Sequence, residues 1–253
     1  MNWTEEKLSK LTRIINYYIT KIFFIWRLIS PKSVYYVVDK YKWLIIWTIF
    51  HRKIDRNQWR DSKSWENYNS LMTMSWEELE SKARSYFQRL KFVVEHVKGH
   101  VLEIGCGIGN ITKWIWSLEK VKQVIALDAF QESIQTLKMH KFPKVIPIQM
   151  RLENMKLEKG KKFDTIILCE IIEHIYPDEE RKMLDTLRGH LNAKTAFIIS
   201  TPIGWMSDAY HIRGFTVTEF KRHLNKYYGP PIKIDYSSGL SQIAFGYFKN
   251  PQN

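Results

Sequence analysis

The chain is predicted to fold as an α/β domain around a mostly parallel β-sheet that closes with an antiparallel hairpin. After Gly99, short apolar strand candidates alternate with helix candidates, whereas the last two strand candidates, residues 231–236 and 242–248, have no helix between them. Alternating β and α units imply parallel strands with helices on both faces, and adjacent strands without a helix pair antiparallel. A chain of 253 residues at 45% hydrophobic is long enough to bury a sizeable core.

Residues 1–84 are predicted to form a helical, basic and aromatic-rich extension, followed by a domain over residues 85–253. Apolar residues recur at steps of three and four until Pro31 ends the pattern. The residues of this stripe are Leu8, Leu11, Ile15, Tyr18, Ile22, Trp26 and Ile29. Ser75, with Glu78 three residues on, predicts a capping box that opens a helix towards Val97. The stripe fits either an ordinary helix packed on the domain or a helix lying on a membrane surface.

The elements of the domain are expected in strict alternation. The strand candidates are residues 100–105, 122–128, 144–150, 163–169 and 195–201, before the closing pair. The helix candidates are residues 110–120, 131–140, 177–190 and 216–227. The seven strands would form one sheet.

Composition limits the class of protein. Two cysteines exclude a disulfide framework, so a reducing cytoplasmic setting is expected. No apolar stretch approaches the roughly 20 residues of a spanning helix, although peripheral membrane contact through the N-terminal helices stays open. Residues 1–60 hold twelve Lys or Arg against four Asp or Glu, within a net charge of +13 for the chain. This surplus suits an anionic partner such as RNA or phospholipid head groups, or simply a solvated basic surface.

The stretch VLEIGCGIGN, residues 101–110, leads from an apolar strand through a glycine turn into a helix. Gly105 and Gly107 would let a ligand approach bare backbone, and Gly109 would open the helix. Glu103 precedes the first glycine, and the spacing is G-x-G-x-G. In these residues the chain resembles class I S-adenosylmethionine-dependent methyltransferases, which implies a Rossmann-like seven-stranded sheet and S-adenosyl-L-methionine as cofactor.

The resemblance extends over about residues 85–253 and implies further cofactor contacts. Asp128 ends the second strand candidate, where it could accept hydrogen bonds from ribose hydroxyls. Glu153 follows the third strand, where it could accept from the adenine amino group. The full set of cofactor-binding residues implied in this way is Glu103, Gly105, Cys106, Gly107, Gly109, Asp128, Ala129, Leu152, Glu153 and Cys169.

The sequence CEIIEHI, residues 169–175, places two acids and a histidine at spacings of three and four. In one helical turn all three would share a face. Glu170-x-x-Glu173-His174 is similar to the motif of ubiquinone-biosynthesis O-methyltransferases and of small-RNA 3′-end 2′-O-methyltransferases. That resemblance implies a divalent metal site made of Glu170, Glu173, His174 and His211.

The chemistry of this motif has three interpretations. A metal such as Zn, Mn or Mg could hold the acceptor oxygen and favour its deprotonated form. Without metal, His174 or His211 could act as the general base, with Glu170 orienting the acceptor. The residues could also be a polar helix entrance with a structural role. Imidazole ligands suit Zn, Mn or Fe, and the expectation of Mg rests only on the resemblance.

The acceptor is open between two classes of enzyme substrate. A small or lipid-like molecule with a hydroxyl is favoured because the segment outside the domain is apolar and aromatic. RNA, methylated on a ribose 2′-hydroxyl, is the alternative suggested by the charge and by His211. A cofactor-binding partner subunit without turnover is a third hypothesis.

Overall fold

The computed structural model describes residues 69–204, 211–237 and 241–249. The predicted N-terminal extension therefore lies outside the described residues up to position 68, and its boundary with the domain stays a prediction. Among the residues described, no helix combines the length and the apolar character needed to cross a bilayer.

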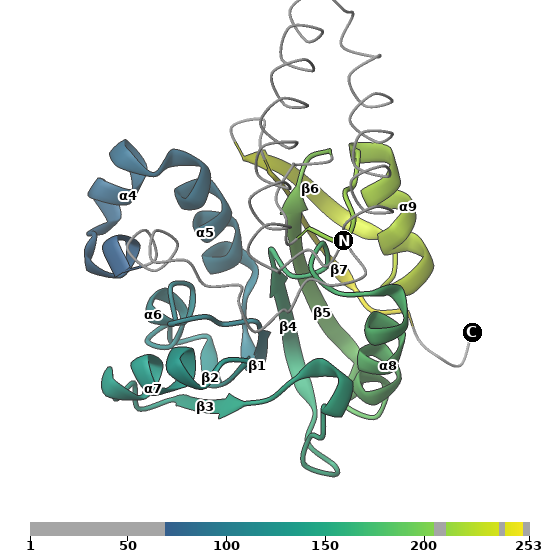
Figure 1. Ribbon diagram of the computed structural model, residues 1–253, viewed down its shortest axis with the longest axis horizontal. Coiled ribbons are helices and arrows are strands. Elements are labelled where there is room, and N and C mark those ends of the chain that lie inside the picture. The colour runs from purple at the N-terminus through teal and green to yellow at the C-terminus, as the bar shows by residue number, and fades with distance from the viewer. Residues whose placement is uncertain (1–68, 205–210, 238–240, 250–253) are drawn as a thin grey trace, which may run out of the picture.

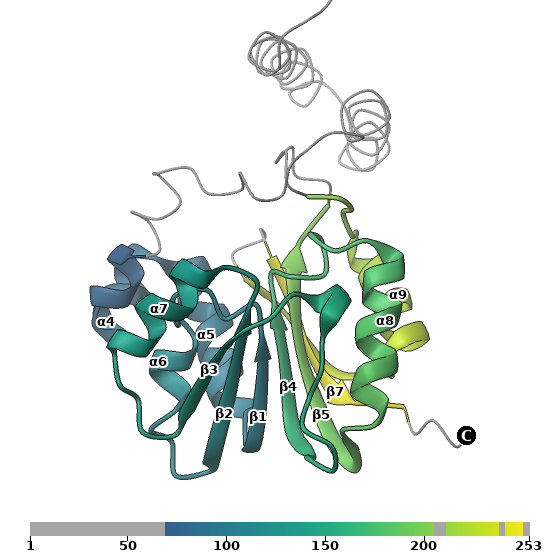
Figure 2. The ribbon, with the colours of Figure 1, turned by 60° about the horizontal axis from the view of Figure 1, so that its bottom comes forward.

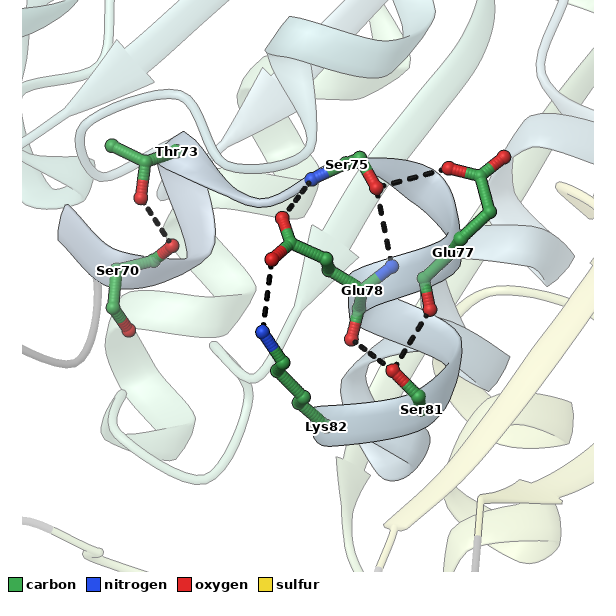
Figure 3. A network of polar contacts seen from close by, with 7 residues as sticks. All are labelled: Ser70, Thr73, Ser75, Glu77, Glu78, Ser81 and Lys82. Carbon is green, nitrogen blue, oxygen red and sulfur yellow. Dashed lines mark hydrogen bonds and ion pairs between the residues drawn. The ribbon is translucent and has the colours of Figure 1, made fainter.

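The described chain begins with helical residues 69–73, which are followed by α4 (Trp76–Lys82) and α5 (Arg84–His96). The predicted capping box is present: the Ser75 hydroxyl accepts the Glu78 N–H at 3.2 Å, and the Glu78 carboxylate accepts the Ser75 N–H at 3.0 Å (Figure 3). Lys82 adds an ion pair to Glu78 one turn on, at 2.9 Å.

A single helix from Ser75 to Val97 was the wrong prediction, because the chain breaks at Ala83 between α4 and α5. The break lets the rings of Trp76 and Phe87 meet with centroids 5.0 Å apart. On one straight helix, eleven residues would separate them by about 16 Å. Trp114 joins the same cluster, 5.2 Å from Trp76, so α4 packs against the domain that follows.

The seven strands form one sheet in the order β3-β2-β1-β4-β5-β7-β6. Five are parallel, and β7 pairs antiparallel with both β5 and β6, as predicted. The strands are β1 (Gly99–Ile104), β2 (Val121–Asp128), β3 (Val145–Gln149), β4 (Phe163–Cys169), β5 (Leu191–Pro202), β6 (Pro231–Ser237) and β7 (Ser241–Tyr247).

Helices cover both faces of the sheet (Figures 1 and 2). Together with α5, α6 (Thr112–Ile115) and α7 (Gln131–Met139) pack on one face over a core that includes Phe92, Ile115 and Leu137. On the other face α8 (Pro177–Arg188) and α9 (Val217–Tyr227) enclose a second core. A 3-10 turn, η3 (Leu152–Asn154), follows β3.

Helix α6 is much shorter than the predicted residues 110–120, because residues 107–111 form consecutive turns rather than helix. The sheet order also brings β1 beside β4, although β2 and β3 lie between them in the chain. The loops that leave the carboxyl ends of these two neighbouring strands therefore meet. At such a reversal of strand order, open α/β sheets bind their ligands.

Candidate functional site

The glycine turn after β1 is fastened to the end of β2 by backbone hydrogen bonds. The N–H groups of Gly105 and Cys106 both donate to the carbonyl of Leu127, at 2.8 and 2.9 Å. All three glycines of the turn adopt positive φ, at 75° for Gly105, 55° for Gly107 and 99° for Gly109. Side chains rarely tolerate such backbone, which accounts for the three glycines.

The three glycines differ in what a side chain would meet. A Cβ at Gly105 would fall 1.9 Å from Cδ1 of Ile171, and one at Gly109 would fall 2.5 Å from Cδ1 of Leu137. A Cβ at Gly107 has no atom within 4 Å. A side chain at Gly105 or Gly109 would therefore require Ile171 or Leu137 to move, whereas Gly107 borders open space.

Asp128, at the carboxyl end of β2, stabilises the glycine turn by accepting a hydrogen bond from its backbone. Its Oδ2 accepts the N–H of Gly107 at 2.8 Å and its Oδ1 accepts the N–H of Phe130 at 2.9 Å. A carboxylate has about four lone-pair positions, so one such group can accept several hydrogen bonds at once. The predicted contact with ribose hydroxyls fits this arrangement and stays a prediction.

Glu103 is buried within β1 beneath the turn, with 2% of its surface exposed. The hydroxyl of Thr112 donates to its Oε2 at 2.5 Å. Burial raises the pKa of Glu103 to about 8, the Thr112 hydrogen bond lowers it, and the nearby charge of Asp128 raises it again. A positively charged donor arriving above the turn would stabilise the ionised form of Glu103.

The other predicted cofactor residues lie around the same edge of the sheet. Ala129 follows Asp128, and its carbonyl accepts from Gln149 Nε2 at 3.3 Å. Leu152 and Glu153 form η3, where Leu152 packs against the core and Glu153 lies exposed 3.9 Å from Arg151. Cys169 ends β4, and burial raises the pKa of its thiol to about 12, so Cys169 is no nucleophile at neutral pH.

Glu170 does not lie with the other predicted metal ligands. It has φ of 57°, a left-handed conformation uncommon for a residue with a side chain. Its N–H donates to the Ser200 carbonyl at 3.0 Å, and its Oε1 accepts the Ser200 hydroxyl at 2.8 Å. Arg89 Nη1 lies 3.3 Å from the same oxygen. The loop is a turn rather than a helix, so Glu170 points towards β5 and α5 instead of sharing a face with Glu173.

Glu173, His174 and His211 come together, and we call these three residues the acid–imidazole triad. One ligand atom from each lies within 4.8 Å of the others. The His174 Nε2 is 3.8 Å from Glu173 Oε1, and the rings of His174 and His211 have centroids 4.7 Å apart. Among the described residues, the triad is the group whose geometry suits a metal ion.

The carboxylate of Glu173 is the most unusual group of the triad. It is 1% exposed, and neither oxygen completes a hydrogen bond of good geometry; the same holds for the nearby hydroxyl of Thr201. Burial raises the pKa of Glu173 well above its ordinary value, and the charge of Glu170 raises it further. Buried carboxylate oxygens are costly without a partner, which a proton or a cation would provide.

The loop that carries His211 is tied to the loop after β4 through backbone atoms. The carbonyl of Glu173 accepts the N–H groups of Ile212 at 2.7 Å and Arg213 at 3.2 Å. The Nε of Arg213 donates to the carbonyl of Ile172 at 2.9 Å. Forty residues of chain separate these loops, yet their hydrogen bonds place His211 beside His174.

The donor set of the triad has consequences for the metal that it suits. One carboxylate and two imidazoles match catalytic zinc sites of the His₂Glu type and also accommodate Mn or Fe. Ligand atoms about 2.1 Å from a tetrahedral ion lie about 3.4 Å from one another. Small side-chain rotations would bring the ligand atoms of the triad to this spacing. Three ligands leave positions for substrate oxygen.

Three residues near the site were missing from the sequence prediction. Arg89 and Tyr86 come from α5, where the Arg89 guanidinium lies 5.5 Å from the centre of the Tyr86 ring. The Tyr86 hydroxyl donates to the carbonyl of Asn110 at 2.8 Å and so braces the end of the glycine turn. Ser200 holds Glu170 from β5. No local motif marks these residues, since their roles depend on which elements the fold brings together.

Part of the chain is similar to known proteins. Residues 101–194 match a family model described as a methyltransferase domain. The ubiquinone biosynthesis O-methyltransferase of Rickettsia felis is 29% identical over 143 residues, which cover 52% of this chain and 55% of that protein. Its counterpart in Bartonella quintana is 32% identical over 77 residues, 30% of each chain. The match with the Rickettsia protein thus spans about half of that protein's length.

Solved structures share the fold. DhpI, in a complex with SAM and HEP, is 16% identical with a TM-score of 0.56, covering 71% of this chain and 90% of its own. The glycopeptide N-methyltransferase MtfA, in its complex with S-adenosyl-L-methionine, is 15% identical with a TM-score of 0.52, covering 64% of this chain and 93% of its own. The chain therefore has the Rossmann-like fold of these enzymes, as predicted.

Proposed function

We propose that this chain, which carries a methyltransferase domain over residues 101–194, transfers a methyl group from S-adenosyl-L-methionine to an oxygen atom of a small acceptor. The observation that supports this best is a juxtaposition at the carboxyl edge of the sheet. The open space at Gly107 lies in the loop after β1. Glu173 and His174 of the acid–imidazole triad lie in the loop after the neighbouring strand β4.

The donor would occupy the space bordered by Gly107 and Asp128. Asp128, at the carboxyl end of β2, would accept the ribose hydroxyls, and Glu103 in β1 would offset the positive charge of the methionine moiety. Leu152 would contact the adenine ring, with Glu153 accepting from its amino group. Ile171 fills the side of the turn nearest to Gly105 and would limit how deeply the donor enters.

Methyl transfer is an in-line displacement. The acceptor oxygen forms a bond to the methyl carbon while the bond from that carbon to sulfur breaks, and its electron pair stays on sulfur as S-adenosylhomocysteine. The proton of the acceptor hydroxyl must leave, and His174 or His211 would receive it at a ring nitrogen. Holding both reactants in one line supplies much of the acceleration in such reactions.

In a metal-bound form, Glu173, His174 and His211 would instead serve as ligands of a divalent metal, and the histidines would not act as the base. Such an ion, when bound, acts as a Lewis acid that orients the acceptor oxygen and favours its deprotonated form. Two observations support its fit: the carboxylate oxygens of Glu173 are buried without hydrogen bonds, and the ligand atoms lie within 4.8 Å of one another. Glu170, engaged with Ser200 and Arg89, would remain outside the ligand set.

Two observations support the proposed acceptor class: the names of the relatives and the sequence ahead of the domain. Relatives from Rickettsia and Bartonella are named ubiquinone biosynthesis O-methyltransferases, which points to a small, lipid-like acceptor with a hydroxyl. The apolar stripe of residues 8–29 would suit delivery of such an acceptor from a membrane surface, to which the chain would bind peripherally.

A direct test supplies methyl-labelled S-adenosyl-L-methionine to the full chain with a hydroxylated aromatic carrying a lipid tail, or with small single-stranded RNA. Label in the aromatic, recovered as a methyl ether, supports the proposal. Label on a ribose 2′-oxygen would instead identify RNA as the acceptor. The affinity of the chain for RNA should then fall steeply with salt concentration. Tight cofactor binding with no transfer to any hydroxyl would reduce the chain to a non-catalytic partner.

A further inference from the structure

Strand β6 is the edge of the sheet. Within the part of the chain that the structure describes, it pairs with β7 alone. Every second residue of an edge strand directs its backbone N–H and C=O away from the sheet, where they can pair with another strand. The faces of β6 are covered by α5 on one side and α9 on the other, so its open side is the edge itself.

The side chains of β6 alternate regularly from Lys233 onward, whereas the register with β7 shifts between Pro231 and Lys233. Ile234 and Tyr236 lie on the face of α9, where Ile234 packs against the core. Ile232 is 65% exposed and Tyr236 is 45% exposed, both large apolar groups. Lys233 and Asp235 lie on the other face, where Lys233 Nζ is 5.1 Å from the centre of the Phe92 ring.

The sequence of β6 is self-complementary about Ile234. If two copies pair antiparallel around a two-fold axis through this residue, Lys233 of each copy lies opposite Asp235 of the other. On the opposite face, Ile234 lies opposite itself. Cross-strand pairs of opposite charge stabilise a sheet.

The neighbouring registers are repulsive. A two-fold axis perpendicular to the sheet keeps each face continuous, so the register can shift only by moving the axis one residue at a time. An axis through Lys233 would place two lysines opposite each other, and an axis through Asp235 would do the same with two aspartates. Like charges directly opposite destabilise a strand pair. The charges of β6 therefore select the register centred on Ile234.

We infer that β6 is a homodimerisation edge through which two copies of this chain join their sheets into one. A symmetric contact of this kind is self-complementary by necessity, because the same surface serves both copies. Lys233 Nζ lies 3.6 Å from Glu95 Oε2 of its own chain, and the Lys233 side chain is 47% exposed. Its long side chain can therefore rotate towards the second copy. The inference does not depend on the proposed methyl transfer.

Such an interface is small, since the regular pairing about Ile234 spans only residues 233–235 of each copy. Interfaces below about 1,200 Å² are characteristic of weak or transient complexes. The dimer is therefore expected to dissociate at micromolar concentrations. Association and dissociation would be visible as a concentration-dependent sedimentation coefficient of the full chain.

Sedimentation velocity of the full chain from about 1 to 100 µM gives the dissociation constant for a charge-swap series. Asp235→Lys places Lys233 opposite a lysine, and Lys233→Asp places Asp235 opposite an aspartate; each is expected to weaken the dimer about tenfold or more. The double variant, with both charges exchanged, restores the opposite pairs and is expected to recover dimerisation. Glu158→Lys, an exposed position before β4, is the matched control for net charge.

Zero-length carbodiimide cross-linking of mixed light and heavy copies gives a second readout, a peptide pair joining Lys233 of one copy to Asp235 of the other. Thermal unfolding of each variant separates loss of dimer from loss of fold. A full chain that sediments as a monomer over the whole range overturns the inference, as would coverage of the edge by residues 1–68. A dimer that withstands Asp235→Lys overturns it as well, by moving the contact elsewhere.

Discussion

The guanidinium of Arg213 lies 2.8 Å from the carboxylate of Glu180, with the two side chains 14% and 2% exposed. Arg213 follows His211 by two residues, and its Nε donates to the carbonyl of Ile172, the residue before Glu173. Glu180 belongs to α8. A single ion pair thus fixes both loops of the acid–imidazole triad to one helix, and the geometry of the triad depends on it.

Glu180 is held by more than Arg213. The Tyr228 hydroxyl donates to its Oε1 at 2.6 Å, and His223 Nε2 lies 2.9 Å from the same oxygen. Burial opposes the ionisation of Glu180, but the hydrogen bond and charge of His223, and the charge of Arg213, lower the pKa of Glu180 below its ordinary value. The network therefore contributes its full stability to the fold above the unfolded pKa of Glu180. This contribution is lost as the pH falls through the lower pKa of Glu180 in the folded state.

Removing one member of this network is expected to damage both stability and the triad. Glu180→Gln leaves the buried charge of Arg213 uncompensated and is expected to cost about 3–5 kcal/mol in the free energy of unfolding. Arg213→Lys keeps the charge and is expected to cost less. Denaturant unfolding measures the stability, and titration of the folded variant with Mn²⁺ measures the triad.

Asp185→Asn is the control, because Asp185 forms an exposed ion pair with Arg188 on the same helix. Exposed pairs contribute about 0–1 kcal/mol, so this variant should unfold like the parent. If folded Glu180→Gln binds Mn²⁺ as tightly as the parent, the network supports the fold alone.

Substitutions within the triad should separate metal binding from cofactor binding. Glu173→Gln and His211→Ala each remove one of three ligands, and the affinity for Mn²⁺ or Zn²⁺ is expected to fall at least about tenfold. Affinity for S-adenosylhomocysteine should stay within about threefold of the parent. Calorimetric titration with each ligand gives both constants.

His140→Ala serves as the control for the loss of an imidazole, since His140 is exposed beyond the end of α7. Glu170→Gln should leave metal affinity almost unchanged, because Glu170 lies outside the triad. A large loss of metal affinity in this variant would restore the four-ligand site of the sequence prediction.

The glycine turn allows stability and cofactor affinity to be tested separately. Gly107→Ala places a methyl group in open space at φ of 55°, so it should cost about 1 kcal/mol of stability while obstructing the cofactor. Gly105→Ala places its Cβ 1.9 Å from the end of the Ile171 side chain, which must move, so this variant should lose more stability than Gly107→Ala. Calorimetry with S-adenosylhomocysteine and thermal unfolding give the two quantities.

Gly160→Ala is the matched control, with φ of 83° and no atom within 4 Å of its added Cβ. It lies in the loop before β4, at the opposite end of the strand from the site. It should lose similar stability and keep cofactor affinity. Equal cofactor affinity in Gly107→Ala and Gly160→Ala would contradict the placement of the donor.

The sequence predicted the strands well because their signal is local. Each parallel strand is a short apolar run bounded by polar residues, as in 163–169, and this pattern survives in the fold without change. The capping box at Ser75 is equally local and was confirmed. The hairpin of β6 and β7 followed from the missing helix between them.

What the sequence could not provide depends on contacts between distant segments. The helix break at Ala83 follows from packing of Trp76 on Phe87 and Trp114. The position of Glu170 follows from its left-handed backbone and from Ser200, thirty residues away. Helical spacing placed all of E-x-x-E-H on one face, but the turn after β4 separates its first acid from the other two residues.

Glu103 gives the protein a predicted pH dependence of stability. Burial raises the pKa of Glu103 to about 8, so between its unfolded pKa near 4.5 and this folded value the native state binds the additional proton. Stability then decreases as the pH rises through that window, because the native state must either retain the proton at increasing cost or release it and leave a buried charge. The expected loss from this group is about 2 kcal/mol between pH 6 and pH 8.

Glu103→Gln keeps the acceptor for the Thr112 hydroxyl and removes the titration. Its stability relative to the parent should therefore rise from pH 6 to pH 8, while its affinity for the positively charged cofactor should fall. Denaturant unfolding at the two pH values, with S-adenosylhomocysteine absent, measures the difference. Parallel pH profiles of the parent and Glu103→Gln would mean that the carboxyl group ionises normally beneath the turn.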